Sequence, residues 1–277
     1  MEKHHGNKVI IIGAGNLATN LSAALFKTGF RISAVVSNHI ETAKLLADRF
    51  SAKYSSSIGD IEKDADLYIL AVPDKTIPEV LSELPEVNGI VVHASGVTPI
   101  DMLKTARAKG YGVFYPFQTL SKSRQVDFSE VPLLLEADSP ETYQYLNHAA
   151  SLISKNVVQV DSLSRSWIHL SGVFANNYTN HVITIAQVLL SNVNIDKKIL
   201  KPLVEETITK AFQINPFNAQ TGPAVRFDDS TLEKHIEMLE NRYPELVRIY
   251  KELSLSIQSF TKINCNYKSG LDDHEEF

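Results

Sequence analysis

The chain has 277 residues, 44% apolar and 21% charged, which is ordinary for a globular protein with substantial cores. Its net charge of −5 and its lack of basic tracts argue against a general nucleic-acid binder. A single cysteine excludes an internal disulfide, and the sequence shows neither an apolar leader nor an 18-residue apolar run. We therefore expect a cytoplasmic protein with no membrane segment.

The N-terminal segment carries the most informative motif. Val9–Ile12 is an aliphatic run that predicts a buried strand, residues 13–18 spell Gly-Ala-Gly-Asn-Leu-Ala, and Leu17–Lys27 predicts a helix. A strand, a G-x-G-x-x-A turn and a helix in this order are the fingerprint of a dinucleotide-binding fold. Gly13 permits the tight turn and Gly15 lets the backbone approach a pyrophosphate. The alternative is a glycine-rich turn that binds nothing.

Strands and helices alternate through the first 160 residues. Further strands are expected at 31–36, 66–72, 89–93, 111–115 and 131–136, and helices at 41–50, 99–109 and 140–154. This alternation predicts an α/β fold with a doubly wound, mostly parallel sheet. Such sheets bind ligands beyond the carboxyl ends of their strands, so the residues that follow each strand should share one rim. These are Gly13, Ser37, Val72-Pro73-Asp74 and His93-Ala94-Ser95-Gly96.

The pattern changes near residue 160. Beyond it, helical periodicity predicts helices at 164–192, 197–212, 231–241 and 244–263, with a turn-rich loop at 215–223. We expect a dinucleotide-binding domain over residues 1–160 and an all-helical substrate and dimerisation domain over 161–277. The polar residues from Lys268 onward are expected to be disordered.

The end of the second strand favours NADP over NAD. NAD-specific folds place a carboxylate there to bind the ribose, but here Ser37-Asn38-His39 follow and the first acid is Glu41, inside the next helix. Ser37 and Asn38 can donate to a 2′-phosphate and Lys44 adds charge, although no arginine is present to clamp it. The predicted cofactor-binding residues are Gly13, Gly15, Asn16, Leu17, Ala18, Ser37, Asn38, Val72, Pro73, Asp74 and His93.

The long helix at 164–192 carries a polar stripe. On an ideal α-helix, Arg165, His169, Asn176, Asn180 and Gln187 fall within about 40° of one direction. The apolar residues around them are expected to bury the helix on most sides. One interpretation is a polar seam satisfied by its neighbours. The other is that the stripe faces a nicotinamide, with His169 donating a proton and Asn176 and Asn180 orienting a carbonyl or imine.

Three further segments are candidates for the walls of a site. Ser95, with Gly96 after it, can hold a substrate carboxylate, or Ser95 can cap a helix beginning at Pro99. The segment Tyr115-Pro116-Phe117-Gln118-Thr119 can wall the site or pack as an ordinary loop. In a later loop, Arg226 can clamp an anion, or it can pair with Asp228.

Together these segments resemble bacterial Rossmann-like proteins with a C-terminal domain of unknown function 2520. The resemblance runs from Val9 to about Tyr250. It rests on residues 13–18, 72–74, 93–96 and 115–119, on His169 with Asn176, and on Thr221-Gly222-Pro223. These proteins are distant relatives of pyrroline-5-carboxylate reductase, the β-hydroxyacid dehydrogenases and ketopantoate reductase.

The resemblance implies a nicotinamide site at a domain interface and a homodimer formed through the helical domain. The β-hydroxyacid dehydrogenases use a lysine on the first long helix as proton donor, whereas this chain has none between Lys155 and Lys197 and offers Arg165 and His169 instead. The serine-glycine loop of those enzymes matches Ser95-Gly96 and implies an anionic substrate.

We therefore predict an NADP-dependent oxidoreductase that reduces a small carbonyl or imine compound bearing a carboxylate. The predicted catalytic residues are His169, Asn176, Asn180 and Ser95, and the predicted substrate-binding residues are Ser95, Gly96, Arg165 and Arg226. No metal, nucleic acid or membrane is expected to bind. The alternatives are a sensor or scaffold that binds NADP without turnover, which the missing lysine favours, and a redox enzyme with a deazaflavin or metal–flavin partner.

Overall fold

The computed structural model describes residues 7–267 and divides into two compact units between His181 and Val182. The expectation for residues 268–277 lies outside the described residues. The sheet ends at Gln159, close to the domain boundary expected at 160. The compact units nevertheless divide about twenty residues later, because the helix that follows the sheet packs back onto it through Arg165 and His169.

The first unit is built on an eight-stranded sheet with the order β3-β2-β1-β4-β5-β6-β7-β8. The strands are β1 (Lys8–Ile12), β2 (Arg31–Val36), β3 (Lys53–Ser55), β4 (Leu67–Leu70), β5 (Ile90–His93), β6 (Gly110–Pro116), β7 (Leu133–Ala137) and β8 (Val157–Gln159). All neighbouring pairs are parallel except β6 with β7. The predicted doubly wound, mostly parallel sheet is confirmed.

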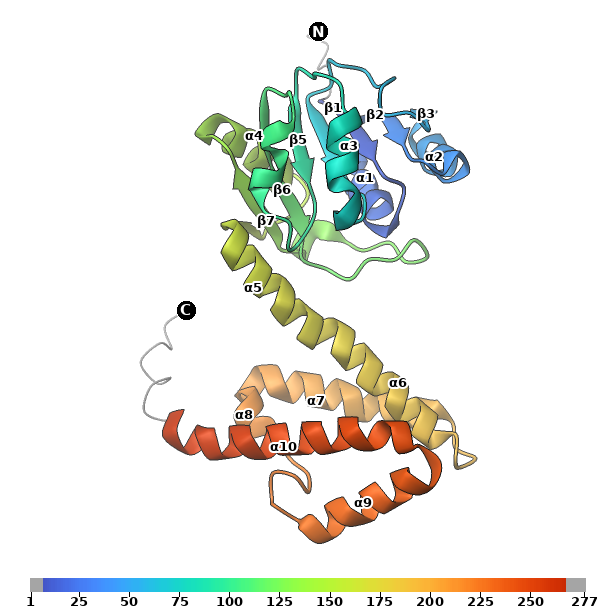
Figure 1. Ribbon diagram of the computed structural model, residues 1–277, viewed down its shortest axis with the longest axis vertical. Helices are drawn as coiled ribbons and strands as arrows, with labels where there is room; N and C mark the ends of the chain where they lie inside the picture. Colours follow the sequence, from blue (N-terminus) through green and yellow to red (C-terminus); the bar gives the residue numbers. More distant parts are fainter. Residues whose placement is uncertain (1–6, 268–277) are drawn as a thin grey trace. The chain divides into compact units, whose positions relative to one another are not determined.

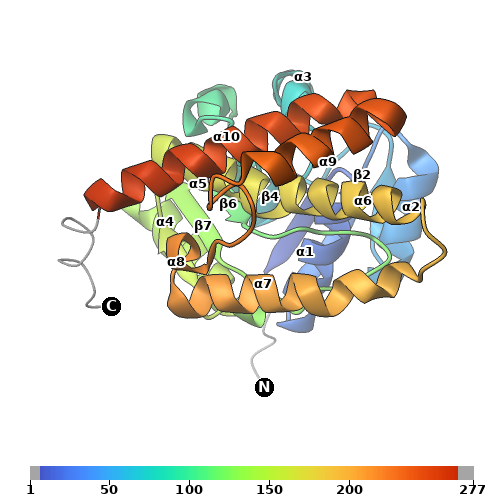
Figure 2. The same ribbon diagram turned by 90° about the horizontal axis from the view of Figure 1, so that it is seen from below.

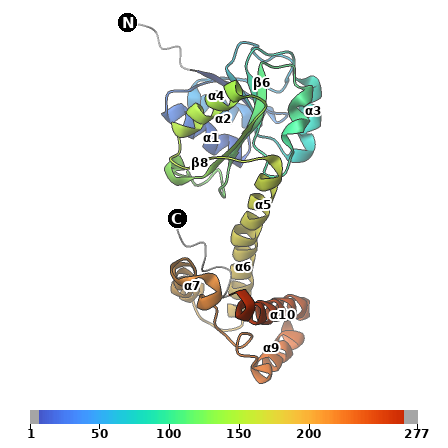
Figure 3. The same cartoon turned by 90° about the vertical axis from the view of Figure 1, so that its left-hand side faces the viewer.

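Helices cover both faces of this sheet (Figures 1 and 3). In β1, Val9 and Ile11 face one core and Ile10 and Ile12 face the other, because side chains alternate along a strand. The first core is closed by α1 (Asn16–Lys27), α2 (Ile40–Ala47) and α4 (Pro140–Ser151). The second core is closed by α3 (Ile77–Glu83) and the 3₁₀ helix η3 (Ile100–Thr105).

Some short elements differ from the prediction. The helix expected at 99–109 is the 3₁₀ segment η3, in which Leu103 is the one buried side chain, so packing gives it little support as a regular α-helix. Strand β3 and helix α3 were not predicted. They are three and seven residues long, which is too short to show a clear period.

The segment expected as one helix at 164–192 contains a change of helix type. It comprises α5 (Ser162–Gly172), a π-helical turn η5 (Val173–Tyr178) and α6 (Thr179–Leu190). The expectation that apolar neighbours bury this helix is wrong, since Trp167 is 65% exposed and Phe174 62%. The reason is that the polar stripe faces the sheet: Arg165, His169 and Gly172, spaced four and three residues apart, touch the sheet side of this unit.

The second unit is helical, as expected. It contains the remainder of α6, then η6 (Lys197–Ile199), α7 (Leu200–Ile214), α8 (Pro216–Ala219), α9 (Asp229–Arg242) and α10 (Pro244–Tyr267). Helices α9 and α10 run side by side from the turn at Tyr243 (Figure 2), and the Tyr243 hydroxyl donates to Asn192 Oδ1 at 3.1 Å. Within residues 7–267, every helix is too short or too polar to span a bilayer.

Candidate functional site

The strand ends of the first unit form one row. Four adjacent parallel strands end level with one another, at Val36, Ile12, Leu70 and His93. The next strand, β6, runs parallel beside them with Val113 opposite His93 and continues to Pro116. The residues that follow them in the chain therefore emerge at the same rim of the sheet, as the sequence predicted. This rim is where open parallel sheets bind their ligands.

A cavity of about 610 Å³ lies at this rim above the glycine turn. Its wall includes six of the predicted cofactor residues, namely Gly13, Gly15, Ser37, Asn38, Val72 and Pro73. Asn16, Leu17, Ala18, Asp74 and His93 are not part of the wall. The wall also contains polar residues that were not predicted to bind cofactor: His39, Thr42, Ser56, Thr76, Glu79, Glu83 and Lys122.

The glycine turn suits a pyrophosphate. Gly13 has φ +114°, and a Cβ there would collide with the Ala71 carbonyl. Gly15 has no atom within 4 Å of where its Cβ would stand, so the space beside its backbone is open and belongs to the cavity wall. No side chain caps the N-terminus of α1, whereas Ser139, Asp161 and Asp228 cap α4, α5 and α9. The first N–H groups of α1 thus remain available to an anion, and the residues present fit a dinucleotide.

The end of β2 offers neutral donors. Ser37, Asn38, His39 and Thr42 line the cavity there, and the Ser37 hydroxyl accepts from the His39 N–H at 3.3 Å. Neither Glu41 nor Lys44 belongs to the wall, so the contribution expected from the Lys44 charge is not supported. This part of the wall carries no carboxylate that would repel a 2′-phosphate.

A second group of side chains brings His169 to the same rim. The Tyr115 hydroxyl, at the end of β6, lies 2.9 Å from His169 Nδ1, and their rings are tilted with centroids 6.0 Å apart. A Cβ on Gly96 would overlap the His169 imidazole, so the ring packs directly on the Gly96 backbone. A Cβ on Gly172 would likewise overlap the Phe117 ring, so this ring packs directly on the Gly172 backbone. The segment after β6 therefore helps to seat α5.

The electrostatic surroundings connect this pair to the cavity. Burial raises the pKa of the Tyr115 phenol, the charge of Asp74 raises it further, and the charge of Arg165 lowers it. Asp74 directly follows Pro73 of the cavity wall. A protonated phenol can both donate and accept, so it can hold Nδ1 of the imidazolium or of the neutral ring and leave Nε2 for a substrate.

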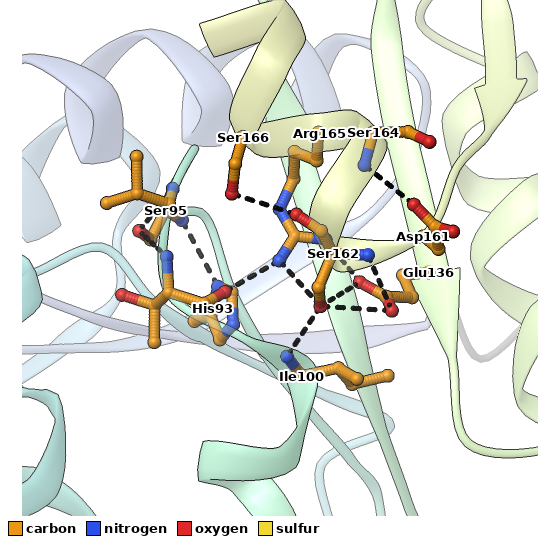
Figure 4. Close-up of polar contacts among 11 residues, drawn as sticks. His93, Ser95, Ile100, Glu136, Asp161, Ser162, Ser164, Arg165 and Ser166 are labelled. Atoms are coloured by element: carbon orange, nitrogen blue, oxygen red, sulfur yellow. Dashed lines mark hydrogen bonds and ion pairs between the residues drawn. The ribbon is translucent and has the colours of Figure 1, made fainter. Parts of the chain in front are cut away.

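Arg165 lies in a buried polar cluster at the start of α5. Its side chain is fully buried, forms an ion pair with Glu136 through Nη1, and donates from Nη2 to the Thr98 carbonyl at 2.6 Å (Figure 4). Ser162 joins the cluster, since its hydroxyl donates to Glu136 Oε2 at 2.8 Å. A buried guanidinium needs a carboxylate partner, which Glu136 from β7 supplies, and substrate binding by Arg165 stays a prediction. The cluster anchors the first turn of α5 and so positions His169 one turn later.

His93, at the end of β5, is also fully buried. Its Nδ1 accepts the Ser95 N–H at 3.2 Å, and Nε2 has no partner within the described part of the chain. Burial, with the charge of Arg165, lowers its pKa to about 4. The ring is enclosed below the rim and stabilises the turn after β5, and cofactor binding by His93 stays a prediction.

The helix-capping interpretation of Ser95 is wrong, because the first N–H of η3, that of Ile100, donates to the Ser162 hydroxyl at 3.0 Å and not to Ser95. Ser95 instead closes the turn between β5 and η3. Its hydroxyl accepts from the N–H groups of Val97 and Thr98 at 3.2 and 2.9 Å, and the residue is 5% exposed. The turn therefore presents Gly96 to His169, and a catalytic or substrate-binding role of Ser95 stays a prediction. In the helical unit, Asp228 caps α9 by accepting from the N–H and the hydroxyl of Thr231. These hydrogen bonds lower the pKa of the Asp228 carboxyl, and the charge of the exposed Arg226 lowers it further.

The polar stripe does not keep one direction along the whole helix. The π-helical turn η5 places an additional residue in one turn, and the Thr179 hydroxyl bonds to the Phe174 carbonyl five residues back. Asn176, inside this turn, and Asn180 and Gln187, beyond it, are thus rotated away from the direction calculated from His169. Asn176 and Asn180 as substrate-orienting residues stay a prediction. Among residues 7–267, no three potential ligands gather into a metal site.

Among what sequence reasoning missed, the charge of Lys122 and the pairing of Tyr115 matter most for the proposals below. Lys122 reaches the cavity from the loop between β6 and β7, and no local pattern marks it. Tyr115 was considered a wall residue, not a partner of His169. A hydrophobic strand that ends in tyrosine was the signal available, but the pairing depends on contacts 54 residues apart.

The sheet order, the glycine turn and the cavity define a Rossmann-type nucleotide-binding fold. Residues 8–95 match a family model described as "NADP oxidoreductase coenzyme F420-dependent", and residues 131–257 match a domain of unknown function, DUF2520. A solved structure described as a "putative NADP oxidoreductase" from Bacteroides fragilis is 38% identical, with a TM-score of 0.84, over 92% of this chain and 98% of that one. The chain belongs to this family of NADP oxidoreductase-related proteins that carry the DUF2520 domain.

Two more distant structures share the fold. A pyrroline-5-carboxylate reductase from Coxiella burnetii is 20% identical with a TM-score of 0.55, covering 93% of this chain and 97% of that one. A reductive aminase from Aspergillus terreus, in complex with NADPH and ethyl-5-oxohexanoate, is 14% identical with a TM-score of 0.61, covering 94% of each chain.

Proposed function

We propose that this protein is an NADP-dependent oxidoreductase that reduces the carbonyl or imine group of a small, carboxylate-bearing compound. The observation that carries the proposal is the shared rim: an open glycine turn with its cavity, and a histidine held by Tyr115 and Gly96, both lie beyond the carboxyl ends of the parallel strands. The NADP assignment is supported by the carboxylate-free wall at Ser37 and Asn38 and by the family. NADPH is the first cofactor to test. The family model over residues 8–95 is described as an NADP oxidoreductase, and the reductive aminase was solved in complex with NADPH.

In the proposed reaction, the reduced nicotinamide supplies a hydride to the carbonyl or imine carbon. His169, as imidazolium, gives its Nε2 proton to the oxygen or nitrogen that gains the electron pair. Tyr115 keeps hold of Nδ1 before and after this transfer, so the ring stays oriented. Asn176, Asn180, Ser95 and Gly96 are the proposed contacts for the rest of the substrate.

The test is a screen of 2-oxo acids and cyclic imines as substrates with NADPH. Turnover is measured as the loss of NADPH absorbance. His169→Ala should lower kcat by about a hundredfold while NADPH affinity is retained. His148→Ala, which removes an exposed histidine on α4, is the matched control and should change neither. NADPH binding without turnover of any carbonyl or imine would instead favour the sensor interpretation.

A deazaflavin partner deserves one arm of the same screen, because the family model over residues 8–95 is described as coenzyme F420-dependent. Hydride would then pass between NADP and the deazaflavin. Reduction of coenzyme F420 by NADPH, with no reduction of 2-oxo acids or imines, would favour this second candidate.

We propose further that two copies of the chain pair through the helical unit. Phe212 is 90% exposed, Leu203 65% and Leu255 58%, so these apolar side chains find little cover in their own unit. Several large apolar side chains left exposed on one unit are typical of an interface. Light scattering should give a dimer for the wild type and a smaller species for Phe212→Glu, whereas a monomeric wild type would overturn this proposal.

A further inference from the structure

The loop between β6 and β7 is fastened to the start of α1. Asn20, only 4% exposed, donates to the Ser121 carbonyl at 2.9 Å and accepts from the Val126 N–H at 3.3 Å. Asn16, the first residue of α1, accepts the Lys122 N–H on its Oδ1 at 3.2 Å. The Asn20 amide also donates to the Asn16 carbonyl at 2.9 Å, which ties the two asparagines together. We call these two residues the asparagine clamp.

The clamp sets the position of Lys122. Because a buried amide must satisfy both its donor and its acceptor, Asn20 fixes the loop on either side of Lys122. The backbone of Lys122 is thereby held beside the open N-terminus of α1, and Lys122 lines the cavity together with Gly13 and Gly15. Its ammonium is free of any ion pair with the described residues.

Lys122 differs in charge from the acidic residues Glu79 and Glu83 of the cavity wall. Among the described residues, it is the one lysine or arginine in the cavity wall, whereas Glu79 and Glu83 place two carboxylates there. An anion that enters the cavity thus meets two repelling groups, and the α1 N-terminus alone offers a partial positive charge. A lysine at the glycine turn supplies the missing full charge.

We propose that Lys122 binds the pyrophosphate of the dinucleotide. We propose further that the asparagine clamp positions Lys122 for this contact by holding its loop against α1. This inference rests on the proposed function, because it assumes a dinucleotide in the cavity. Lys122 is attached at Asn16, next to Gly15, and not at Ser37 and Asn38, where the 2′-phosphate is proposed to lie. Its contribution is therefore the same for NADPH and NADH, and nucleotide selectivity belongs to the end of β2.

Calorimetric titration of NADPH and NADH into variants of the full chain tests this inference. Lys122→Ala should weaken both nucleotides by about tenfold, the size of one charge-assisted hydrogen bond, and should reduce the salt dependence of binding. Lys122→Arg should retain most of the affinity. Lys109→Ala, an exposed lysine before β6 at the opposite edge of the strands, is the control and should bind as the wild type does.

The clamp is tested by a double-mutant cycle. Asn20→Leu should weaken nucleotide binding to a similar extent as Lys122→Ala. The double variant should lose little further affinity, because both substitutions remove the same contact between Lys122 and the pyrophosphate. Asn16→Ala, at an exposed position, serves the same purpose if Asn20→Leu lowers the melting temperature. Trypsin gives an independent readout, since bound NADPH should slow cleavage after Lys122.

The outcomes separate the two proposals. If the wild type binds NADPH and Lys122→Ala binds it equally well, the inference about Lys122 is overturned and the proposed function stands. A loss confined to NADPH would move Lys122 to the 2′-phosphate and overturn the pyrophosphate assignment. If the wild type binds neither nucleotide, both proposals fail together.

Discussion

Tyr115 Oη lies 2.9 Å from His169 Nδ1, and this contact joins the end of β6 to α5 across 54 residues of sequence. The contact leaves Nε2 as the ring nitrogen available to a substrate. His169 is thus oriented by a phenol that burial keeps protonated, with its pKa raised above the ordinary value. The orientation of the proposed proton donor can be tested separately from its identity.

Tyr115→Phe removes the hydroxyl and keeps the ring. We expect kcat to fall by about tenfold with KM nearly unchanged, because the imidazole loses its orientation but substrate contacts remain. The ¹⁵N chemical shift of His169 Nδ1 should change as well, which a purely structural role would not cause. Tyr111→Phe on the same strand is the control. Unchanged kcat and shift would remove Tyr115 from the site.

Gly96→Ala tests the close approach of His169. The new Cβ would overlap the imidazole, so the ring must leave its place and turnover should fall by at least about tenfold, with NADPH affinity retained. Gly59→Ala is a suitable control, since the nearest atom to a Cβ there is 3.7 Å away. Full activity of Gly96→Ala would show that His169 need not occupy this position.

The buried pair of Arg165 and Glu136 should matter for stability. Glu136→Ala leaves a fully buried guanidinium without its carboxylate, and we expect the free energy of unfolding to fall by about 3 kcal/mol. Glu130→Ala breaks an exposed pair with Lys155 and should change stability little. Chemical denaturation of both variants gives the comparison. Equal stability of the two would mean that the buried pair does not anchor α5.

His93 predicts a pH dependence of stability. Its pKa is about 4 in the folded chain and about 6.5 when unfolded, so the unfolded state binds the proton more readily. The stability associated with neutral His93 is present above about pH 6.5 and is lost as pH falls toward 4, on the order of 3 kcal/mol. His93→Asn keeps an acceptor for the Ser95 N–H and cannot titrate. Denaturation of both proteins at pH 7 and 4.5 should show a steeper loss for the wild type.

The sheet was predictable because its information is local. The aliphatic runs of β1, β4 and β5 are followed directly by turn residues, and the fingerprint at residues 13–18 fixes the first strand, turn and helix. Helix α3 escaped prediction because seven residues show too little of a helical period. The change to a π-helix at Val173–Tyr178 was also invisible, since an ideal periodicity was assumed throughout.

The chemical roles were less predictable than the fold. Helical spacing predicted that Arg165 and His169 point in one direction. It could not show that Arg165 would form a buried ion pair with Glu136, or that Tyr115 would form a hydrogen bond with His169. Both partners come from distant strands of the sheet. Lys122 depends on a loop whose place is set by Asn20, a residue that looks like any polar position in a helix.

The most direct test is calorimetric titration of the wild type and of Gly15→Val with NADPH, NADP, NADH and NAD. We expect the wild type to bind NADPH with preference over NADH. At 100 times the dissociation constant, the ligand should stabilise the fold by about 2.7 kcal/mol. Gly15→Val should remain folded and bind none of the four, because its side chain enters the space open beside Gly15. A wild type that binds no nucleotide, or a Gly15→Val that binds as tightly, would contradict a dinucleotide site at this turn.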